Sequence, residues 1–133
     1  MRFKFFLIYI LLLSCGNEYD YIDPVYVYER VYLDNPENSE LKIPGNYKFI
    51  EGGIKGIVIY NFGSQEYLAF DRVCTFENNI AIDSINSIIA ICKNCDSKFL
   101  LNQNGINSDG PAPTPLIQYN CVLRENNTLY ITN

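Results

Sequence analysis

The chain has 133 residues, of which ten are lysine or arginine, fifteen are aspartate or glutamate and none is histidine, giving a net charge of −5. This length is enough for one hydrophobic core and too short for two. The negative charge disfavours contact with nucleic acid and with anionic lipid headgroups, because both carry charge of the same sign.

The first fifteen residues have the pattern of an export signal. Arg2 and Lys4 give a basic start, residues 5–13 form an apolar run, and Ser14 and Cys15 follow. This run is too short to cross a bilayer, which takes about 20 helical residues, and it fits the apolar region of a signal peptide. The small residue before Cys15 resembles a bacterial lipobox, so we expect cleavage after residue 14 and a lipid on Cys15. The alternative is an ordinary signal peptide that ends at a cysteine.

Lipidation at Cys15 has three consequences. Removing 14 residues from 133 leaves a mature chain of 119, and losing Arg2 and Lys4 changes the net charge from −5 to −7. Attachment to the membrane then depends on acyl chains rather than on a basic patch. The domain is expected outside the cytoplasm in the bacterial cell envelope, with the outer membrane favoured, where disulfides persist.

The mature chain begins with a polar segment and continues as a series of strands. Residues 15–24 are polar and acidic and end in a proline, which predicts a tether before a domain at 25–133. Residues 25–33 alternate between valine or leucine and mostly tyrosine, as in an amphipathic strand. Residues 35–46 are rich in turn formers and predict a loop. Further strands are expected at residues 47–51, 56–62, 66–71, 87–91, 98–101, 117–123 and 128–132.

The predicted elements indicate an all-β fold. No stretch shows sustained helical periodicity, and β-branched and aromatic residues dominate the apolar positions. Many short strands at close spacing are typical of an antiparallel β sandwich or barrel. The eleven tyrosines could form a ligand platform, but we favour the outer surface of an amphipathic sheet as their role.

Three loops carry the unusual residues of the chain. A strand leads into the loop 74–77, and a second strand leads into the loop 92–96. The loop 110–116 is stiff, because proline fixes the backbone angle φ and lacks an N–H donor. We expect all three loops to lie together at one end of the β structure, although the third could be only a rigid connection. The residues that define them are Cys74, Cys92 and Cys95 in the first two, and Gly110, Pro111, Pro113 and Pro115 in the third.

Four stretches together resemble one protein family. Its opening strands are similar to LKIPGNYKFIEGGIKGIVIYNF, and its first cluster loop follows a strand similar to YLAFDRVC. Its second loop, Cys-x-x-His-Gly-Ser-x-Phe, corresponds to CKNCDSKF, and its proline-rich loop is similar to DGPAPTPLIQY. By these motifs residues 25–133 resemble a Rieske-type iron–sulfur domain, specifically the Rieske-like lipoproteins of Bacteroidetes. The resemblance implies a Rieske-like antiparallel β sandwich or barrel with two cluster-type loops and a proline-rich loop.

The resemblance also identifies degenerate cluster positions. A Rieske [2Fe–2S] centre has two cysteine and two histidine ligands. The cysteine positions fall on Cys74 and Cys92, and the histidine positions fall on Phe76 and Cys95. Phenylalanine cannot bind iron and the chain has no histidine, so a true Rieske cluster is excluded.

Other uses of the cysteines stay open. An all-cysteine [2Fe–2S] cluster or a zinc site would need Cys74, Cys92 and Cys95 together with Cys121. We expect no metal, and we expect Cys121 to be a buried sheet residue rather than a ligand. A thioredoxin-like activity is disfavoured, because strands flank the C-x-x-C motif and a catalytic one starts a helix. If Cys95 is free, its neighbours Lys93 and Lys98 are expected to lower its pKa.

The family's geometry implies a disulfide in place of the cluster. Two cysteines that bind the same iron lie close together, so without iron Cys74 and Cys92 are expected to form a disulfide in an oxidising compartment. Closing a loop of roughly 20 residues in this way stabilises a fold by about 3 kcal/mol. The ring of Phe76 is expected to fill the space that a cluster would occupy.

These observations predict a membrane-anchored envelope lipoprotein that serves as a non-catalytic binding or structural module. Its expected partners are the membrane, through the lipid, and an unknown envelope protein. The alternatives are an electron carrier with an all-cysteine [2Fe–2S] cluster and a thiol or metal site for sensing or storage. Catalysis is disfavoured, because no nucleophile–base pair or paired carboxylates stand out. Asp71 and Arg72 are expected to form a local structural pair.

Overall fold

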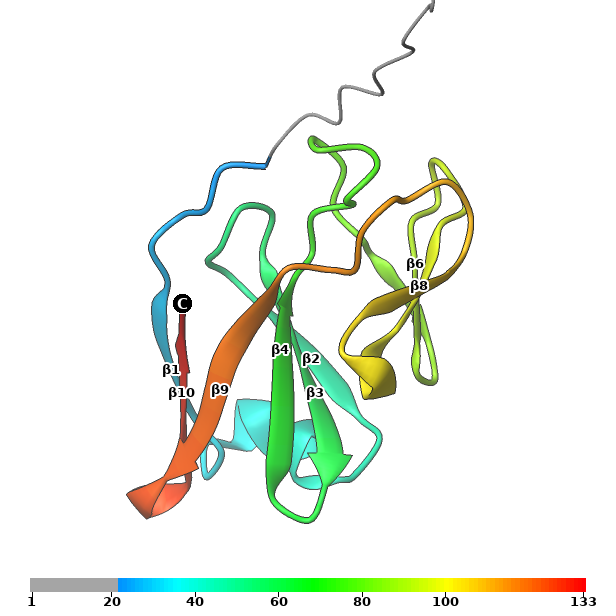
Figure 1. Ribbon diagram of the computed structural model, residues 1–133. Helices are drawn as coiled ribbons and strands as arrows, with labels where there is room; N and C mark the ends of the chain where they lie inside the picture. The colour runs from blue at the N-terminus through cyan, green and yellow to red at the C-terminus, as the bar shows by residue number, and fades with distance from the viewer. Residues whose placement is uncertain (1–21) are drawn as a thin grey trace, which may run out of the picture.

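The computed structural model describes residues 22–133, which form two antiparallel β-sheets connected by loops and three short 3-10 helices (Figure 1). The predicted all-β fold is confirmed. The signal peptide, Cys15 and most of the tether lie outside the described residues. No helix within residues 22–133 has both the length and the apolar character needed to cross a membrane.

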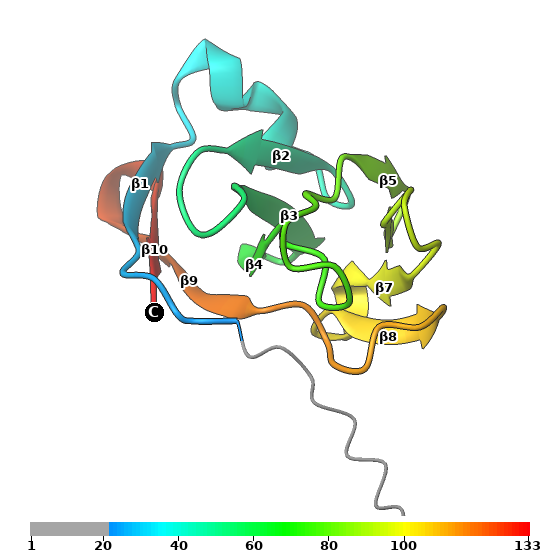
Figure 2. The ribbon, with the colours of Figure 1, turned by 90° about the horizontal axis from the view of Figure 1, so that it is seen from above.

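The larger sheet has six strands in the order β1-β10-β9-β4-β3-β2. Seen from above, it curls into a half-barrel, with the second sheet beside it (Figure 2). Its strands are β1 (Tyr28–Tyr32), β2 (Tyr47–Ile50), β3 (Ile57–Gly63), β4 (Glu66–Asp71), β9 (Gln118–Arg124) and β10 (Thr128–Thr132).

Strand β3 shows why this sheet has apolar side chains on both faces. Ile57 and Ile59 point into a core enclosed by the curled sheet, together with Val31 and Leu129. Val58 and its alternate neighbours point the other way, into a second core that the smaller sheet shares. The single core expected from the chain length is thus divided in two, because β3 and β4 are buried on both faces. Residues of a strand alternate between faces, so the nearly continuous apolar run at 57–60 corresponds to a strand buried on both sides.

The smaller sheet has four short strands in the order β5-β6-β7-β8. They are β5 (Ser84–Asn86), β6 (Ile89–Ile91), β7 (Lys98–Leu100) and β8 (Ile106–Asp109). Ala90 and Phe99 are fully buried in the second core, where they pack with Phe70 of the larger sheet. The cysteine loops follow β4 and β6, so the two sheets place them at a common end of the molecule (Figure 1).

The predicted elements differ from the structure in three places. Residues 35–46 were expected to be an irregular loop, but Pro36–Lys42 forms a 3-10 helix that buries Leu41 against the larger sheet. Strands β5 and β8 were not predicted, because both are short and β8 contains the mostly polar sequence INSD. The other 3-10 helices are single turns at Leu101–Gln103 and Glu125–Asn127.

Candidate functional site

The first cysteine loop begins directly after β4. Val73 pairs with Ala81 in an isolated bridge, and the Cys74 N–H donates to the Ile80 carbonyl at 2.9 Å. The segment from Cys74 to Ile80 is therefore closed as a hairpin-like loop. The backbone N–H groups of Phe76 and Glu77 both hydrogen-bond to the Cys74 sulfur.

The second cysteine loop is a tight turn between β6 and β7. The Cys92 N–H donates to the Ser97 carbonyl at 2.9 Å, and the Asp96 N–H donates to the Cys92 carbonyl at 2.8 Å. Asp96 has a φ of 59°, in the left-handed region that glycine occupies most easily and that Asp and Asn tolerate better than most residues. The Rieske pattern has glycine at this position, so Asp96 preserves the turn despite the substitution.

The proline-rich loop contacts both cysteine loops. The Thr75 hydroxyl donates to the Thr114 carbonyl at 2.8 Å, and the Ala112 N–H donates to Ser97 Oγ at 3.0 Å. A Cβ on Gly110 would lie 2.5 Å from Ser97 Cα, so only glycine allows this approach. The predicted arrangement of the three loops is confirmed.

The three loop cysteines converge on one point. The sulfurs of Cys74, Cys92 and Cys95 all lie within 4.8 Å of one another. The Cys74 and Cys95 sulfurs are 3.6 Å apart, and Cys95 Sγ is 3.2 Å from Ser97 Oγ. Cys74 and Cys92 are fully buried, whereas Cys95 is partly exposed. Solvent therefore reaches the group from the Cys95 side.

The environment affects the thiols of Cys74 and Cys95 in opposite directions. Burial raises the pKa of Cys74 to about 12, and a hydrogen bond with Cys92 adds to this effect. Burial also opposes ionisation of Cys95, but hydrogen bonds from the Ser97 side chain and backbone, together with those from Cys92 and Cys74, outweigh it and lower the pKa of Cys95. The direction agrees with the prediction, but the causes are these hydrogen bonds rather than the two lysines. Lys93 and Lys98 instead form ion pairs with Asp83 and Asp109.

One expectation about the cluster positions is wrong, and another stays a prediction. Phe76 does not fill the space of a cluster, because its side chain is 49% exposed while the Cys74 sulfur beside it is buried. Its backbone N–H, rather than its ring, contacts the site. The Cys74–Cys92 disulfide stays a prediction: the structure has both cysteines as free thiols, with their sulfurs within 4.8 Å of each other and the Cys74 and Cys95 sulfurs 3.6 Å apart.

The fourth cysteine is remote from this group. Cys121 lies in β9 and packs against the core of the larger sheet, while the other three cysteines belong to the second core. Burial raises the pKa of Cys121 to about 12. The expectation of a sheet residue holds, although its burial is partial, and Cys121 cannot complete a four-cysteine site.

Asp71 is a buried residue that fixes the approach to the first cysteine loop. Its carboxylate accepts hydrogen bonds from the Ile54 N–H at 2.6 Å, the Val73 N–H at 2.8 Å and the Tyr119 hydroxyl at 2.7 Å. Burial and the neighbouring carboxylate raise the pKa of Tyr119. Asp71 thus has the predicted structural role, but not with Arg72, whose guanidinium lies over the Phe49 ring and donates to the Ile82 carbonyl. Sequence reasoning missed Tyr119, which no local pattern marks.

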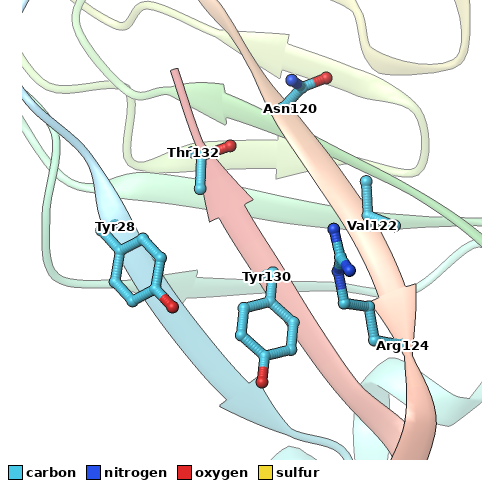
Figure 3. Close-up of a pocket in the computed structure, with 6 residues that line it drawn as sticks. All are labelled: Tyr28, Asn120, Val122, Arg124, Tyr130 and Thr132. Atoms are coloured by element: carbon cyan, nitrogen blue, oxygen red, sulfur yellow. The ribbon is translucent and has the colours of Figure 1, made fainter.

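A second candidate surface is the outer face of β1, β10 and β9 (Figure 3). The rings of Tyr28 and Tyr130 pack edge to face at 6.4 Å, and the Arg124 guanidinium lies 5.6 Å from the Tyr130 ring centre. Val122 lies exposed beside them. This aromatic face, defined by Tyr28, Tyr130, Val122 and Arg124, has the composition of an amphipathic sheet surface, and tyrosine and arginine are also enriched in protein interfaces.

The chain matches no family model and no curated protein. Its structure is similar to the ferredoxin of carbazole 1,9a-dioxygenase from Nocardioides aromaticivorans IC177, with a TM-score of 0.55 and 15% identity over 82% of this chain and 96% of that one. It is also similar to a chain in the complex of reduced oxygenase and oxidized ferredoxin of carbazole 1,9a-dioxygenase, with a TM-score of 0.56 and 15% identity over 83% of this chain and 94% of that one. At this identity the likeness concerns the fold alone: the chain has the Rieske-like fold of these ferredoxins.

Proposed function

We propose that the chain is a lipid-anchored protein of the bacterial cell envelope whose Rieske-like domain has lost the Rieske cluster and serves as a non-catalytic binding module. The observation that carries this proposal is the set of donor atoms at the three loops. The site offers three thiols and no imidazole, on a fold shared with ferredoxins.

The residues present do not fit a Rieske cluster. One iron of such a centre needs two histidine nitrogens, and its other iron needs two cysteine sulfurs. The chain contains no histidine, and Phe76 offers only an apolar, half-exposed ring. The ligand set that gives a Rieske centre its high potential is therefore missing.

The absence of a Rieske cluster can be tested by purifying the protein under anaerobic conditions and then applying absorption spectroscopy, electron paramagnetic resonance and iron analysis. The expected result is a protein without the spectrum of a histidine-ligated [2Fe–2S] centre. A Rieske-type resonance with two irons per chain would refute the proposal.

The lipid anchor sets where the module acts. The segment from Cys15 to Pro24 has ten residues, and even fully extended it spans at most about 35 Å. The domain would thus stay within one protein diameter of the membrane and meet other envelope proteins there. Replacing Cys15 with serine should release the protein from the membrane fraction and abolish fatty-acid labelling. Unchanged partition and labelling would exclude the anchor.

The aromatic face supports a protein as the partner. A photoreactive phenylalanine analogue at position 130 tests this in living cells, with the analogue at position 62 as a matched control. Both positions hold aromatic residues of the larger sheet, and Phe62 is exposed at the far end of β3. We expect a discrete cross-linked species from position 130 and none from position 62. The absence of any adduct at position 130 would argue against this face.

The second candidate is an electron carrier with an all-cysteine [2Fe–2S] cluster. The convergence of three sulfurs and the likeness to ferredoxins favour it. It needs a fourth ligand, and within residues 22–133 no carboxylate or further cysteine joins the three sulfurs. Two irons per chain with a cluster spectrum but no Rieske-type resonance would identify this function instead.

A further inference from the structure

The spacing of the three sulfurs matches the ligand shell of one metal ion. A tetrahedral zinc ion with zinc–sulfur bonds of about 2.3 Å holds its sulfurs about 3.8 Å apart. The three sulfurs here lie within 4.8 Å of one another, and the Cys74–Cys95 pair is at 3.6 Å. In a two-iron cluster, sulfurs bound to different irons are farther apart than sulfurs that share an ion. A disulfide would use only two of the three.

The backbone is arranged as expected around metal-bound thiolates. Hydrogen bonding from the Phe76 and Glu77 backbone acts on the Cys74 thiol, and hydrogen bonding from Ser97 acts on the Cys95 thiol, whose sulfur lies 3.2 Å from Ser97 Oγ. Partners of this kind orient and support metal ligands. The left-handed conformation of Asp96 closes the turn that places Cys92 and Cys95 side by side. Both loops thus hold their sulfurs in place by their own hydrogen bonds.

Ser97 connects this group to the proline-rich loop. Its side chain is fully buried, its oxygen accepts the Ala112 N–H at 3.0 Å, and it lies 3.2 Å from the Cys95 sulfur. Ser97 therefore holds Cys95 toward the other two sulfurs and connects the proline-rich loop to the site. Of the three cysteines, Cys95 is the partly exposed one, so solvent reaches the sulfurs on its side.

We propose that Cys74, Cys92 and Cys95 together bind a single thiophilic metal ion of the Zn²⁺ or Cu(I) class, where the related fold would hold a two-iron cluster. Thiolate ligands select such ions. Binding forms three metal–sulfur bonds as the three thiols give up their protons to solvent, and no electron is transferred. On zinc, water or an external donor completes the shell from the Cys95 side; Cu(I) needs only the three sulfurs. This inference goes beyond the envelope-module proposal, and it replaces the expectation from sequence that the site holds no metal.

The test uses the full chain, reduced, stripped of metal and kept anaerobic. Co²⁺ serves as the coloured probe for the zinc class, and Cu(I) supplied under reducing conditions is the second arm. We expect thiolate-to-cobalt charge-transfer absorption that saturates at one ion per chain and disappears when Zn²⁺ displaces the cobalt. Saturation by Cu(I) alone would assign the site to Cu(I). Binding of neither ion, or two irons per chain with a cluster spectrum, would overturn the proposal.

Variants assign the ligands. Replacing Cys95 with serine should weaken binding by at least about 100-fold, because losing a ligand costs no less than losing a supporting residue. Replacing Ser97 with alanine should weaken it by about 10-fold to 100-fold. Cys121→Ser is the matched control, because Cys121 lies in the other core, and it should bind normally. Circular dichroism confirms that each variant is folded. Equal affinity in Cys95→Ser and Cys121→Ser would overturn the assignment.

Discussion

The six-stranded sheet buries side chains on both faces. The four-stranded sheet has strands of only three or four residues, and its only core is the one that it shares with the larger sheet. The larger sheet encloses a core of its own within its curl. The smaller one contributes Ala90 and Phe99 to a core whose remaining members include Val58, Phe70 and the cysteines of the loops.

This difference separates stability from function. Apolar burial increases with the number of long strands that pack together, so the larger sheet supplies most of the free energy that holds the fold. The smaller sheet adds little burial of its own and mainly positions Cys92 and Cys95 against Cys74, which follows β4 of the larger sheet. Regions with few buried contacts open locally at lower free energy than the rest of a protein, so the cysteine site belongs to the part of the molecule with more freedom to adapt.

The strongest test of this comparison is the side chain that joins the two sheets. Phe70 lies on β4, is fully buried and packs in the shared core. Replacing it with alanine removes a ring from between the sheets and should lower the free energy of unfolding by about 3–5 kcal/mol. Phe62→Ala, on the exposed end of β3, is the matched control and should change it by no more than about 0.5 kcal/mol. Chemical denaturation measures both, and a small effect at Phe70 would show that the sheets are energetically independent.

Asp71 tests how the larger sheet supports the first cysteine loop. One carboxylate oxygen of Asp71 accepts hydrogen bonds from the Ile54 N–H and the Tyr119 hydroxyl, and the other accepts them from two backbone N–H groups. Asparagine has the same shape, but its NH₂ group must replace one of these oxygens, and it cannot accept the hydrogen bonds made there. Losing charge-assisted bonds of this kind should cost about 1.5–3 kcal/mol of unfolding free energy. Asp83→Asn, at an exposed ion pair, is the control and should be nearly neutral. Equal denaturation midpoints for the two variants would contradict this role.

The two regions also differ in how far their sequences predict them. In the larger sheet each strand carries its own pattern: strict alternation predicted β1, and an unbroken apolar run predicted β3. In the smaller sheet β5 and β8 have too few residues for any periodicity to show. The convergence of the loops, which the strand order and the resemblance both predict, is confirmed.

The error at the site has a clear physical source. The exposure of the Phe76 ring depends on side-chain orientation within a short turn. A motif aligned residue by residue carries positions but not orientations. The hydrogen bonds of Ser97 and Tyr119 likewise join residues far apart in the sequence, so no local sequence pattern predicts them.

Hydrogen exchange sharpens the comparison without any mutation. Backbone amides of β6 and β7 should exchange through local opening, at least about 10-fold faster than the slowest amides of β3 and β10. The reason is that three-residue strands have few neighbours to hold them closed. Exchange measured by nuclear magnetic resonance on the metal-free, reduced protein gives the comparison directly. Identical protection in both sheets would mean that the domain opens only as a whole.

Thiol reactivity gives the smallest and most local test. Only the thiolate reacts with an alkylating agent, so a cysteine reacts at pH values near and above its pKa if the reagent can reach it. Cys95 is partly exposed and has a lowered pKa, whereas Cys74 is fully buried and Cys121 is partly buried, each with a pKa of about 12. In the metal-free, reduced protein Cys95 should therefore be labelled first. As the pH is lowered, its rate of alkylation should begin to fall at a lower pH than that of an ordinary thiol.

Mass spectrometry of peptides after brief alkylation measures this order. In Ser97→Ala the hydrogen bond between the serine hydroxyl and the Cys95 sulfur is absent, so the pKa of Cys95 should rise and its alkylation rate at neutral pH should decrease. Cys121 should be unaffected, because it lies in the other core. If the proposed ion binds, it should protect Cys95 and leave Cys121 unchanged. Labelling of Cys121 ahead of Cys95 would mean that the partly exposed approach to the three sulfurs is closed in solution.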